Sequence, residues 1–180
     1  GSYALTYSVT DVAGNISTPM TRLVQYYDPV DPPVVHWVEG PNGEANAYDV
    51  TIGSGDAVLT VRSFSDSLSF GSTVLNASGR EDVFLTRREA NGSLIWAKAF
   101  GGIDSDLGAS VVTGPDGSAY VAGSFKGAAM FGESVLISSG DFDAFLAKVD
   151  SDGSVLWAKN IGGASEDRGL CLALANDGSL

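Results

Sequence analysis

The chain repeats itself with a period of 61 residues, and this period limits the folds open to it more than any other feature. Aligning residues 84–119 with 145–180 gives 14 identities in 36 positions without a gap. The matched segments are Phe84-Leu85 with Phe145-Leu146, Trp96-Ala97-Lys98 with Trp157-Ala158-Lys159, Gly101-Gly102 with Gly162-Gly163, and Asp116-Gly117-Ser118 with Asp177-Gly178-Ser179. Fainter matches at the same offset, such as Phe64 with Phe125, extend the pattern backward. Sequence repeated at a fixed period indicates a structural unit that recurs along the chain.

Each repeat contains about four strand candidates. In the clearest copy they cover roughly 109–113, 118–125, 143–149 and 154–160, with a short extra strand near 133–138. Turn sequences separate them at 114–117, 140–141 and 150–153. No helical periodicity runs for a useful length. Four strands per unit at a period above ~40 residues is typical of propeller blades, whereas β-helical coils repeat at shorter intervals. We therefore predict an all-β fold, a partial β-propeller with repeats at about 35–95, 96–156 and 157–180.

The first 27 residues have a different pattern. Apolar residues alternate with small or polar ones over 3–10, and a second strand candidate covers 21–27, with a turn at 11–15 between them. This predicts a β-hairpin, which is marginal alone and needs further strands. Residues 28–34 include three prolines and predict a stiff linker. The chain opens within a strand pattern and stops within a repeat, so we expect it to be part of a longer protein.

Two segments resemble known families. Thr10-Asp11-Val12-Ala13-Gly14-Asn15 is similar to the closing hairpin of bacterial surface Ig-like domains of the HYR and DUF5011 type. Residues 143–150, followed by Gly153, Trp157 and Gly162-Gly163, resemble the bacterial β-propeller repeats called SBBP repeats, and 120–125 with Phe131-Gly132 match a further part of that pattern. The resemblances imply the end of an Ig-like β-sandwich at 1–27, then incomplete propeller blades at 35–180. SBBP proteins are usually large and secreted or surface-attached, and the resemblance implies no reaction.

Composition excludes several function classes. Ten basic and 22 acidic residues give a net charge of -12, which disfavours nucleic acids and anionic membranes. No run approaches the ~18 apolar residues of a membrane span. Cys171 is a single cysteine in an apolar, strand-like run, so we predict a small buried side chain there. His36 is a single histidine in the linker region, which makes Cys/His catalysis or a Cys/His zinc site implausible.

The candidate chemistry lies in acidic turns. Residues 150–153 look like the start of a calcium loop, but Ile161 stands where an EF-hand has its glutamate, so a hairpin turn is favoured. Carboxylates gather at Asp104, Asp106, Glu166 and Asp167, where a glycosidase pair or a calcium site is an alternative. Asp106 and Asp167 alone recur, which favours a loop-bracing role. Trp96 and Trp157 are predicted anchors between blades.

These observations assign no catalytic, cofactor-binding or metal-binding residue. We expect a protein that is not an enzyme: a non-catalytic binding or adhesion module, extracellular or at the cell surface of a bacterium, built from β-propeller repeats. Its candidate partners are carbohydrate or a surface protein, and not nucleic acid. Two alternatives stay open. The chain is part of a secreted polysaccharide-acting hydrolase or lyase whose site lies in other blades, or it is a structural spacer.

Overall fold

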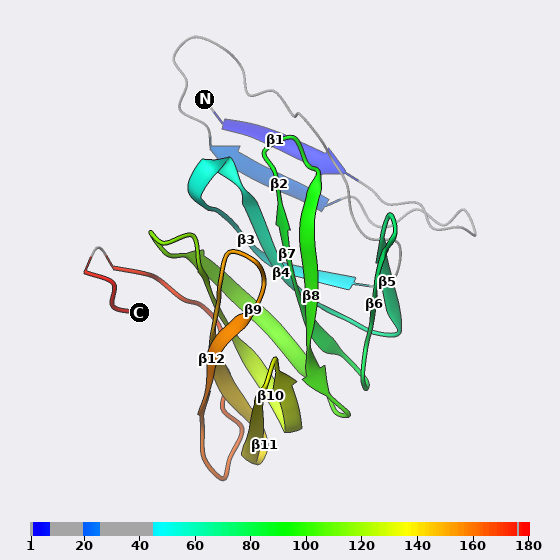
Figure 1. Ribbon diagram of the computed structural model, residues 1–180, viewed down its shortest axis with the longest axis vertical. Coiled ribbons are helices and arrows are strands. Elements are labelled where there is room, and N and C mark those ends of the chain that lie inside the picture. Colours follow the sequence, from blue (N-terminus) through cyan, green and yellow to red (C-terminus); the bar gives the residue numbers. More distant parts are fainter. Residues whose placement is uncertain (1, 8–19, 26–44, 176) are drawn as a thin grey trace. The chain divides into compact units, whose positions relative to one another are not determined.

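The computed structural model describes residues 2–7, 20–25, 45–175 and 177–180, with side chains from Asp49 onward (Figure 1). The chain divides into two compact units, residues 1–36 and 37–180. In the first, β1 (Ser2–Tyr7) pairs antiparallel with β2 (Met20–Gln25), as predicted from the alternating pattern. The turn at 11–15 and the linker at 28–34 lie outside the described residues, and so does His36.

The described part of the second unit contains strands, the loops between them and one short 3-10 turn, η1 (Ser54–Asp56). Its strands are β3 (Ala45–Ile52), β4 (Val58–Phe64), β5 (Ser67–Phe70), β6 (Thr73–Asn76), β7 (Asp82–Arg88), β8 (Leu94–Gly102), β9 (Asp106–Thr113), β10 (Ala119–Phe131), β11 (Ser134–Val149) and β12 (Val155–Ile161). The predicted all-β class is confirmed, with antiparallel sheets throughout. The four strands predicted for the clearest copy correspond to β9, β10, β11 and β12.

Eight strands of this unit form one hydrogen-bonded sheet, in which a short β8–β10 pairing joins two antiparallel meanders of four (Figure 1). Each meander is called a sheet below, and β5 and β6 form a separate hairpin. The first sheet has the order β3-β4-β7-β8, and the second sheet has the order β9-β10-β11-β12. The 61-residue offset maps one onto the other strand by strand, since β3 begins at Ala45 and β9 at Asp106, and β8 begins at Leu94 and β12 at Val155. The β5–β6 hairpin maps onto the outer parts of β10 and β11. One repeat therefore folds as one sheet, and a repeat frame that begins at Ala45 keeps its four strands together.

The two sheets pack against each other and share a core. The second sheet also pairs briefly with the first, because Ala129 and Met130 of β10 face Gly102 and Gly101 of β8. Phe131 is 1% exposed and stacks on Phe100 at 5.9 Å between ring centroids. The buried residues of this core are Ala57, Leu59, Val61, Val83, Leu85, Phe100, Val111, Ala119, Val121, Phe125, Ala129, Phe131, Leu136, Phe145, Ala147 and Val149. A core that draws on both sheets makes each repeat depend on its neighbour.

Trp96 packs on the shared core, and its Nε1 donates a hydrogen bond to the carbonyl of Ser151, in the β11–β12 turn, at 2.8 Å. This contact agrees with the anchoring role predicted for Trp96. Trp157 packs instead beside Tyr120 of its own sheet, with ring centroids 6.1 Å apart.

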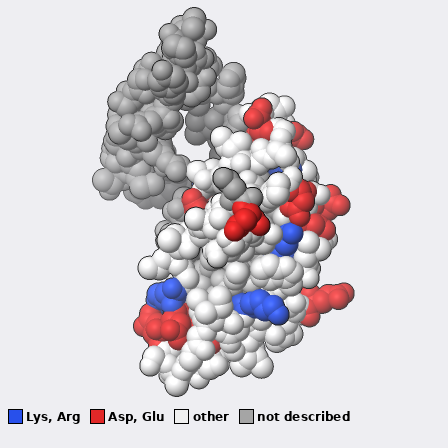
Figure 2. Space-filling model, turned by 90° about the vertical axis from the view of Figure 1, so that its left-hand side faces the viewer, with Lys and Arg blue, Asp and Glu red and all other residues white. Residues whose placement is uncertain are grey.

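Acidic and basic side chains are distributed over the surface in separate groups. Figure 2 shows several groups of Asp and Glu on one face, with Lys and Arg between them and no broad basic stretch among the described atoms of that face. Among the described residues, no helix is long and apolar enough to cross a bilayer.

Candidate functional site

A buried pair of carboxyl groups lies where the first sheet meets the second. Asp82 begins β7 and is 1% exposed, and Asp106 begins β9 and is 0% exposed. Oδ2 of Asp82 accepts a hydrogen bond from the backbone N–H of Ser78 at 2.9 Å. Oδ2 of Asp106 accepts one from the backbone N–H of Gly102 at 2.6 Å. Both side chains therefore brace the backbone of loops at this end of the sheets, as predicted for Asp106.

The glycine pair at 101–102 makes this arrangement possible. A Cβ on Gly101 would lie 2.7 Å from Oδ2 of Asp106 and 2.8 Å from Oδ1 of Asp82, so both carboxyl groups approach the same point. A Cβ on Gly102 would lie 1.9 Å from the carbonyl oxygen of Ala128 on β10. Both positions exclude side chains because other groups occupy the space, and Gly101 also has a φ of 156°.

The pKa values of both carboxyl groups are raised. Burial raises the pKa of Asp106 to about 7, and the nearby charges of Asp82 and Asp104 add to the rise, against hydrogen bonds from the backbone of Gly102 and Lys126. Burial also raises the pKa of Asp82, against hydrogen bonds from Ser78. Oδ1 of Asp82 and Oδ1 of Asp106 are buried without a hydrogen-bond partner. Two ionised groups in this position are costly unless something compensates their charge.

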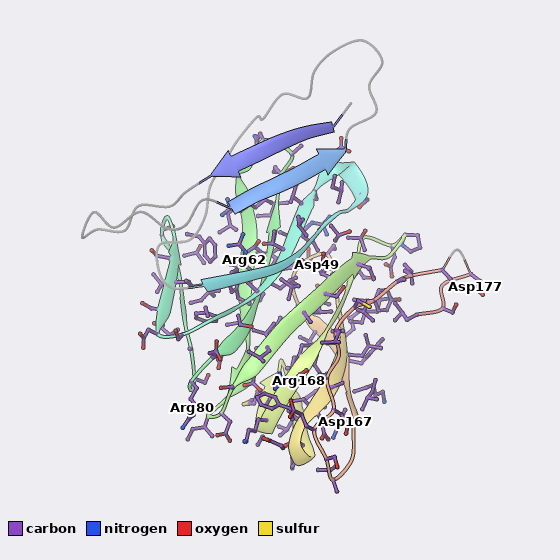
Figure 3. All side chains as sticks on the ribbon, turned by 180° about the vertical axis from the view of Figure 1, so that it is seen from behind. Asp49, Arg62, Arg80, Asp167, Arg168 and Asp177 are labelled. Carbon is purple, nitrogen blue, oxygen red and sulfur yellow. The ribbon has the colours of Figure 1, made fainter. Side chains whose placement is uncertain are left out.

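The same arrangement recurs one repeat later. Oδ2 of Asp143 accepts the backbone N–H of Ser139 at 3.0 Å, and Oδ2 of Asp167 accepts that of Gly163 at 2.8 Å. A Cβ on Gly162 would lie 2.7 Å from Oδ1 of Asp143, which is also buried without a partner. Figure 3 shows Asp167 at the same end of the sheets as Arg80. The two hydrogen bonds from backbone N–H groups to these carboxyl groups therefore recur with the repeat, with Asp167 half-buried.

Main-chain contacts between successive units recur with it. The backbone N–H of Asp106 donates to the carbonyl of Glu81, and that of Asp167 to the carbonyl of Phe142, each at 2.7 Å. Farther along β9, Oδ2 of Asp49 accepts the backbone N–H of Val111 at 2.9 Å. In the next repeat the residue matching Asp49 is a serine, whose Oγ accepts the backbone N–H of Leu172 at 3.1 Å. Residues 167–172 thus bind the second sheet much as β9 binds the first.

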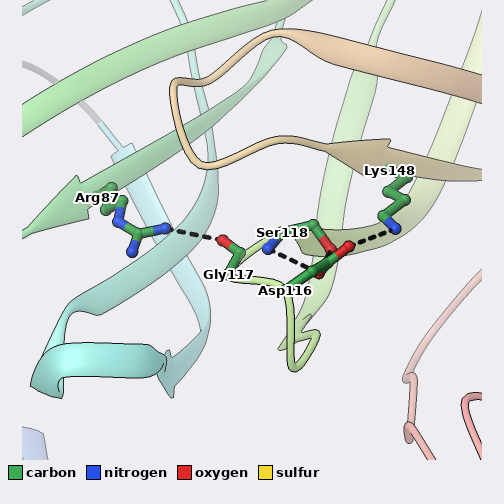
Figure 4. Close-up of polar contacts among 5 residues, drawn as sticks. All are labelled: Arg87, Asp116, Gly117, Ser118 and Lys148. Carbon is green, nitrogen blue, oxygen red and sulfur yellow. Dashed lines mark hydrogen bonds and ion pairs between the residues drawn. The ribbon is translucent and has the colours of Figure 1, made fainter.

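A polar cluster at the opposite end joins the repeats through a turn (Figure 4). Arg87 of the first sheet donates from Nη1 to the carbonyl of Gly117, in the β9–β10 turn, at 2.9 Å. Lys148, its counterpart in the second sheet, donates from Nζ to Oδ2 of Asp116 at 2.9 Å. Hydrogen bonds from Ser118 and Lys148 hold the pKa of Asp116 well below its usual range. Asp116 is exposed, Arg87 and Lys148 are half-buried and Ser118 is buried, and together these contacts fix the turn.

The other acidic candidates take part in a turn and a surface ion pair. Oδ1 of Asp150 accepts the backbone N–H groups of Asp152 and Ser154, at 2.9 and 2.8 Å, which describes a hairpin turn. Glu166 pairs with Arg168 on the surface. Within the described ranges, no three His, Cys, Asp or Glu side chains are arranged to hold a metal ion.

Two sequence inferences need revision. Cys171 is exposed, contrary to the burial predicted for it, because residues 170–175 form no strand and lie along the second sheet with alternate side chains outward. Asp82 and Asp143 were not among the predicted site residues. The repeat could have indicated them, because Asp82 and Asp143 are 61 residues apart, as are Asp106 and Asp167.

Comparison with known proteins gives one partial relationship. No family model matches the chain. The chain is similar to the regulatory protein FlaEY of Caulobacter vibrioides, at 32% identity over 117 residues. The match covers 61% of this chain and 12% of that protein, so the chain spans a small part of the relative it matches.

Proposed function

We propose that the chain is part of a β-propeller that serves as a non-catalytic binding or adhesion module at the bacterial cell surface. One observation carries the proposal: the hydrogen bonds that join successive repeats recur, whereas the side chains at the end of the sheets near Asp82 do not. Recurring residues maintain a scaffold, and the positions that vary on it are free to contact a partner.

Successive repeats are joined by the same kind of hydrogen bonds, which supports a propeller. Hydrogen bonds that join the first sheet to β9 have counterparts that join the second sheet to 167–172. When each repeat is placed on the next in the same way, the repeats build either a closed ring or an open stack. Four-stranded antiparallel meanders that pack face to face are the units of a ring-shaped propeller. We therefore infer that each sheet is one blade.

The non-recurring residues define what we call the variable rim: 80–81, 103–105, 141–142 and 164–166. Arg80 is replaced by Asp141 in the next repeat, and Glu81 by Phe142. Phe142 is half-buried, with the Arg168 guanidinium 4.3 Å and the Lys126 ammonium 5.7 Å from its ring centroid. An aromatic ring with charged neighbours offers both apolar contact and hydrogen bonds, which suits carbohydrate or a polar protein surface.

The relationship to FlaEY is compatible with a module inside a larger protein, since the similar region is 12% of that chain. The regulatory role in that protein's name belongs to that protein. We infer that the two proteins share the architecture of the similar region.

The proposal is tested by screening the purified chain on an array of bacterial and host glycans, in calcium and in EDTA. We expect binding to a restricted set of glycans. The double variant Arg80→Ala, Phe142→Ala should reduce that binding at least tenfold. The matched control Glu89→Ala, Asp152→Ala changes exposed turn residues at the opposite end and should leave it unchanged.

Equal loss in both double variants would refute the variable rim as the contact surface. Absence of glycan binding, together with absence of binding to intact bacterial cells, would overturn the adhesion module. Progressive shortening of array glycans during incubation would favour the hydrolase or lyase alternative.

A further inference from the structure

Two acidic side chains buried side by side must be compensated, and the described neighbours do not do so. Asp82 and Asp106 each use one carboxyl oxygen for a backbone N–H and leave the other without a partner. The nearest basic residue along β10, Lys126, is ion-paired with Asp141 and contributes only its backbone to Asp106. Asp104 adds a further negative charge.

The charged residues around the pair carry both signs. Arg80 and Glu81 directly precede Asp82, and the carbonyl of Glu81 accepts the backbone N–H of Asp106. The β8–β9 loop contributes the negative charge of Asp104, and β10 contributes the backbone of Lys126. Lys126 pairs with Asp141, and none of the ion pairs among the described residues includes Asp82 or Asp106.

We propose that Asp82 and Asp106 share one proton taken from solvent, and that the resulting acid–carboxylate pair is a latch between successive repeats that acid strengthens. The proton sits on one carboxyl group and is donated to the other, which supplies a partner for Oδ1 of Asp82. This oxygen and Oδ2 of Asp106 approach the same point, since they lie 2.8 and 2.7 Å from where a Cβ on Gly101 would be. The proposal is independent of the ligand of the variable rim.

The latch lies between units, so its protonation acts on the junction. Asp82 belongs to the first sheet and Asp106 to the second. Loss of the shared proton leaves two buried negative charges facing each other across this boundary, which weakens the contact. Asp143 and Asp167 make the matching backbone hydrogen bonds at the next boundary, where Oδ1 of Asp143 also lacks a partner.

The direction of the effect follows from linkage. Between the ordinary aspartate pKa of 3.8 and the raised value of about 7, the folded chain binds a proton that the unfolded chain has released. The stability that this proton contributes is therefore fully present below about pH 4 and is lost as the pH rises to about 7. For Asp106 alone, the equilibrium constant for unfolding should be about a hundredfold larger at pH 8 than at pH 5.

The test is urea unfolding of the full chain at pH 5 and pH 8, comparing wild type with Asp106→Asn and with Asp152→Asn. Asparagine keeps an oxygen for the N–H of Gly102 and carries no charge. We expect Asp106→Asn to unfold less readily than wild type at pH 8, and to reduce the ratio between the two pH values by about tenfold or more. Asp152→Asn, in an exposed turn, should leave the ratio unchanged.

A second measurement is direct: the carboxyl carbon of Asp106, followed by NMR, should titrate near pH 7 in wild type and at a lower pH in Asp82→Asn. An ordinary titration near pH 4 in wild type would overturn the proposal. So would equal pH dependence in wild type and Asp106→Asn. Stabilisation by calcium at pH 8 that Asp106→Asn abolishes would replace the proton by a metal ion.

Discussion

Substitution of Gly102 by alanine should separate the two sheets at one point, and the chain supplies its own control. Gly102 and Gly163 occupy the same position in successive repeats. A Cβ on Gly102 would lie 1.9 Å from the carbonyl oxygen of Ala128, whereas nothing lies within 4 Å of a Cβ on Gly163. Neither glycine has a positive φ, so alanine fits the backbone at both. The difference between the two variants isolates the clash.

The size of the effect can be worked out. A carbon and a carbonyl oxygen rarely come closer than about 3.3 Å, so β10 must move by more than about 1 Å. Overpacking of this kind costs about 1–3 kcal/mol, and the short pairing of Ala129 with Gly102 would be disturbed as well. We expect Gly102→Ala to lower the free energy of unfolding by about 2–4 kcal/mol. Gly163→Ala should leave it unchanged or raise it by up to about 1 kcal/mol.

The assay is urea unfolding followed by tryptophan fluorescence, which reports on Trp96 between the sheets and on Trp157 in the second sheet. With a typical slope of about 2 kcal/mol per molar urea, the midpoint of Gly102→Ala should fall by about 1–2 M. Equal midpoints for Gly102→Ala and wild type would refute the close approach of β8 and β10. Equal losses in both alanine variants would show that glycine is needed for another reason.

Three further outcomes are expected. Phe131→Ala removes a buried ring from the shared core and should cost about 3–5 kcal/mol in calorimetric unfolding; a cost below about 1 kcal/mol would contradict the packing. Trp96→Phe keeps most of the apolar contact but loses the 2.8 Å hydrogen bond to the next turn, so chemical denaturation should show a loss of about 1 kcal/mol. Hydrogen bonds from Ser118 and Lys148 lower the pKa of Asp116, so its contribution is present above about pH 4 and fades in acid. Asp116→Asn should therefore flatten the acid limb of the stability curve, opposite in direction to Asp106→Asn.

Most of the second unit could be predicted from the sequence because the signals were local. Turn residues at 114–117 and 150–153 mark hairpins whatever surrounds them, and the period showed which segments are equivalent. The ends of the strands were harder to predict from the sequence. The long hairpin of β10 and β11 continues past the predicted end at residue 125, because its outer part pairs with β8 of the other repeat. That pairing is tertiary and leaves no local mark.

The carboxyl pair could be predicted only in part. Asp106 stood out through its recurrence, and its bracing of a loop follows from the turn position. Its partner Asp82 is the first residue of a buried strand, and an acidic residue at that position is expected to face solvent. Only the packing of two sheets shows that both side chains face Gly101. The prediction that Cys171 is buried was wrong for a related reason. An apolar run does not show which of its side chains are covered by the rest of the protein.

The bonds between repeats also bear on how such proteins diversify. At each boundary described here, a backbone N–H at the start of one unit meets a backbone carbonyl of the preceding unit, at Asp106 with Glu81 and at Asp167 with Phe142. Backbone groups are the same in every residue, so the side chains at 81 and 142 can differ without loss of the bond. A repeat can therefore be duplicated, deleted or exchanged with a sibling through recombination, and the new neighbours will fit without compensating substitutions at these positions.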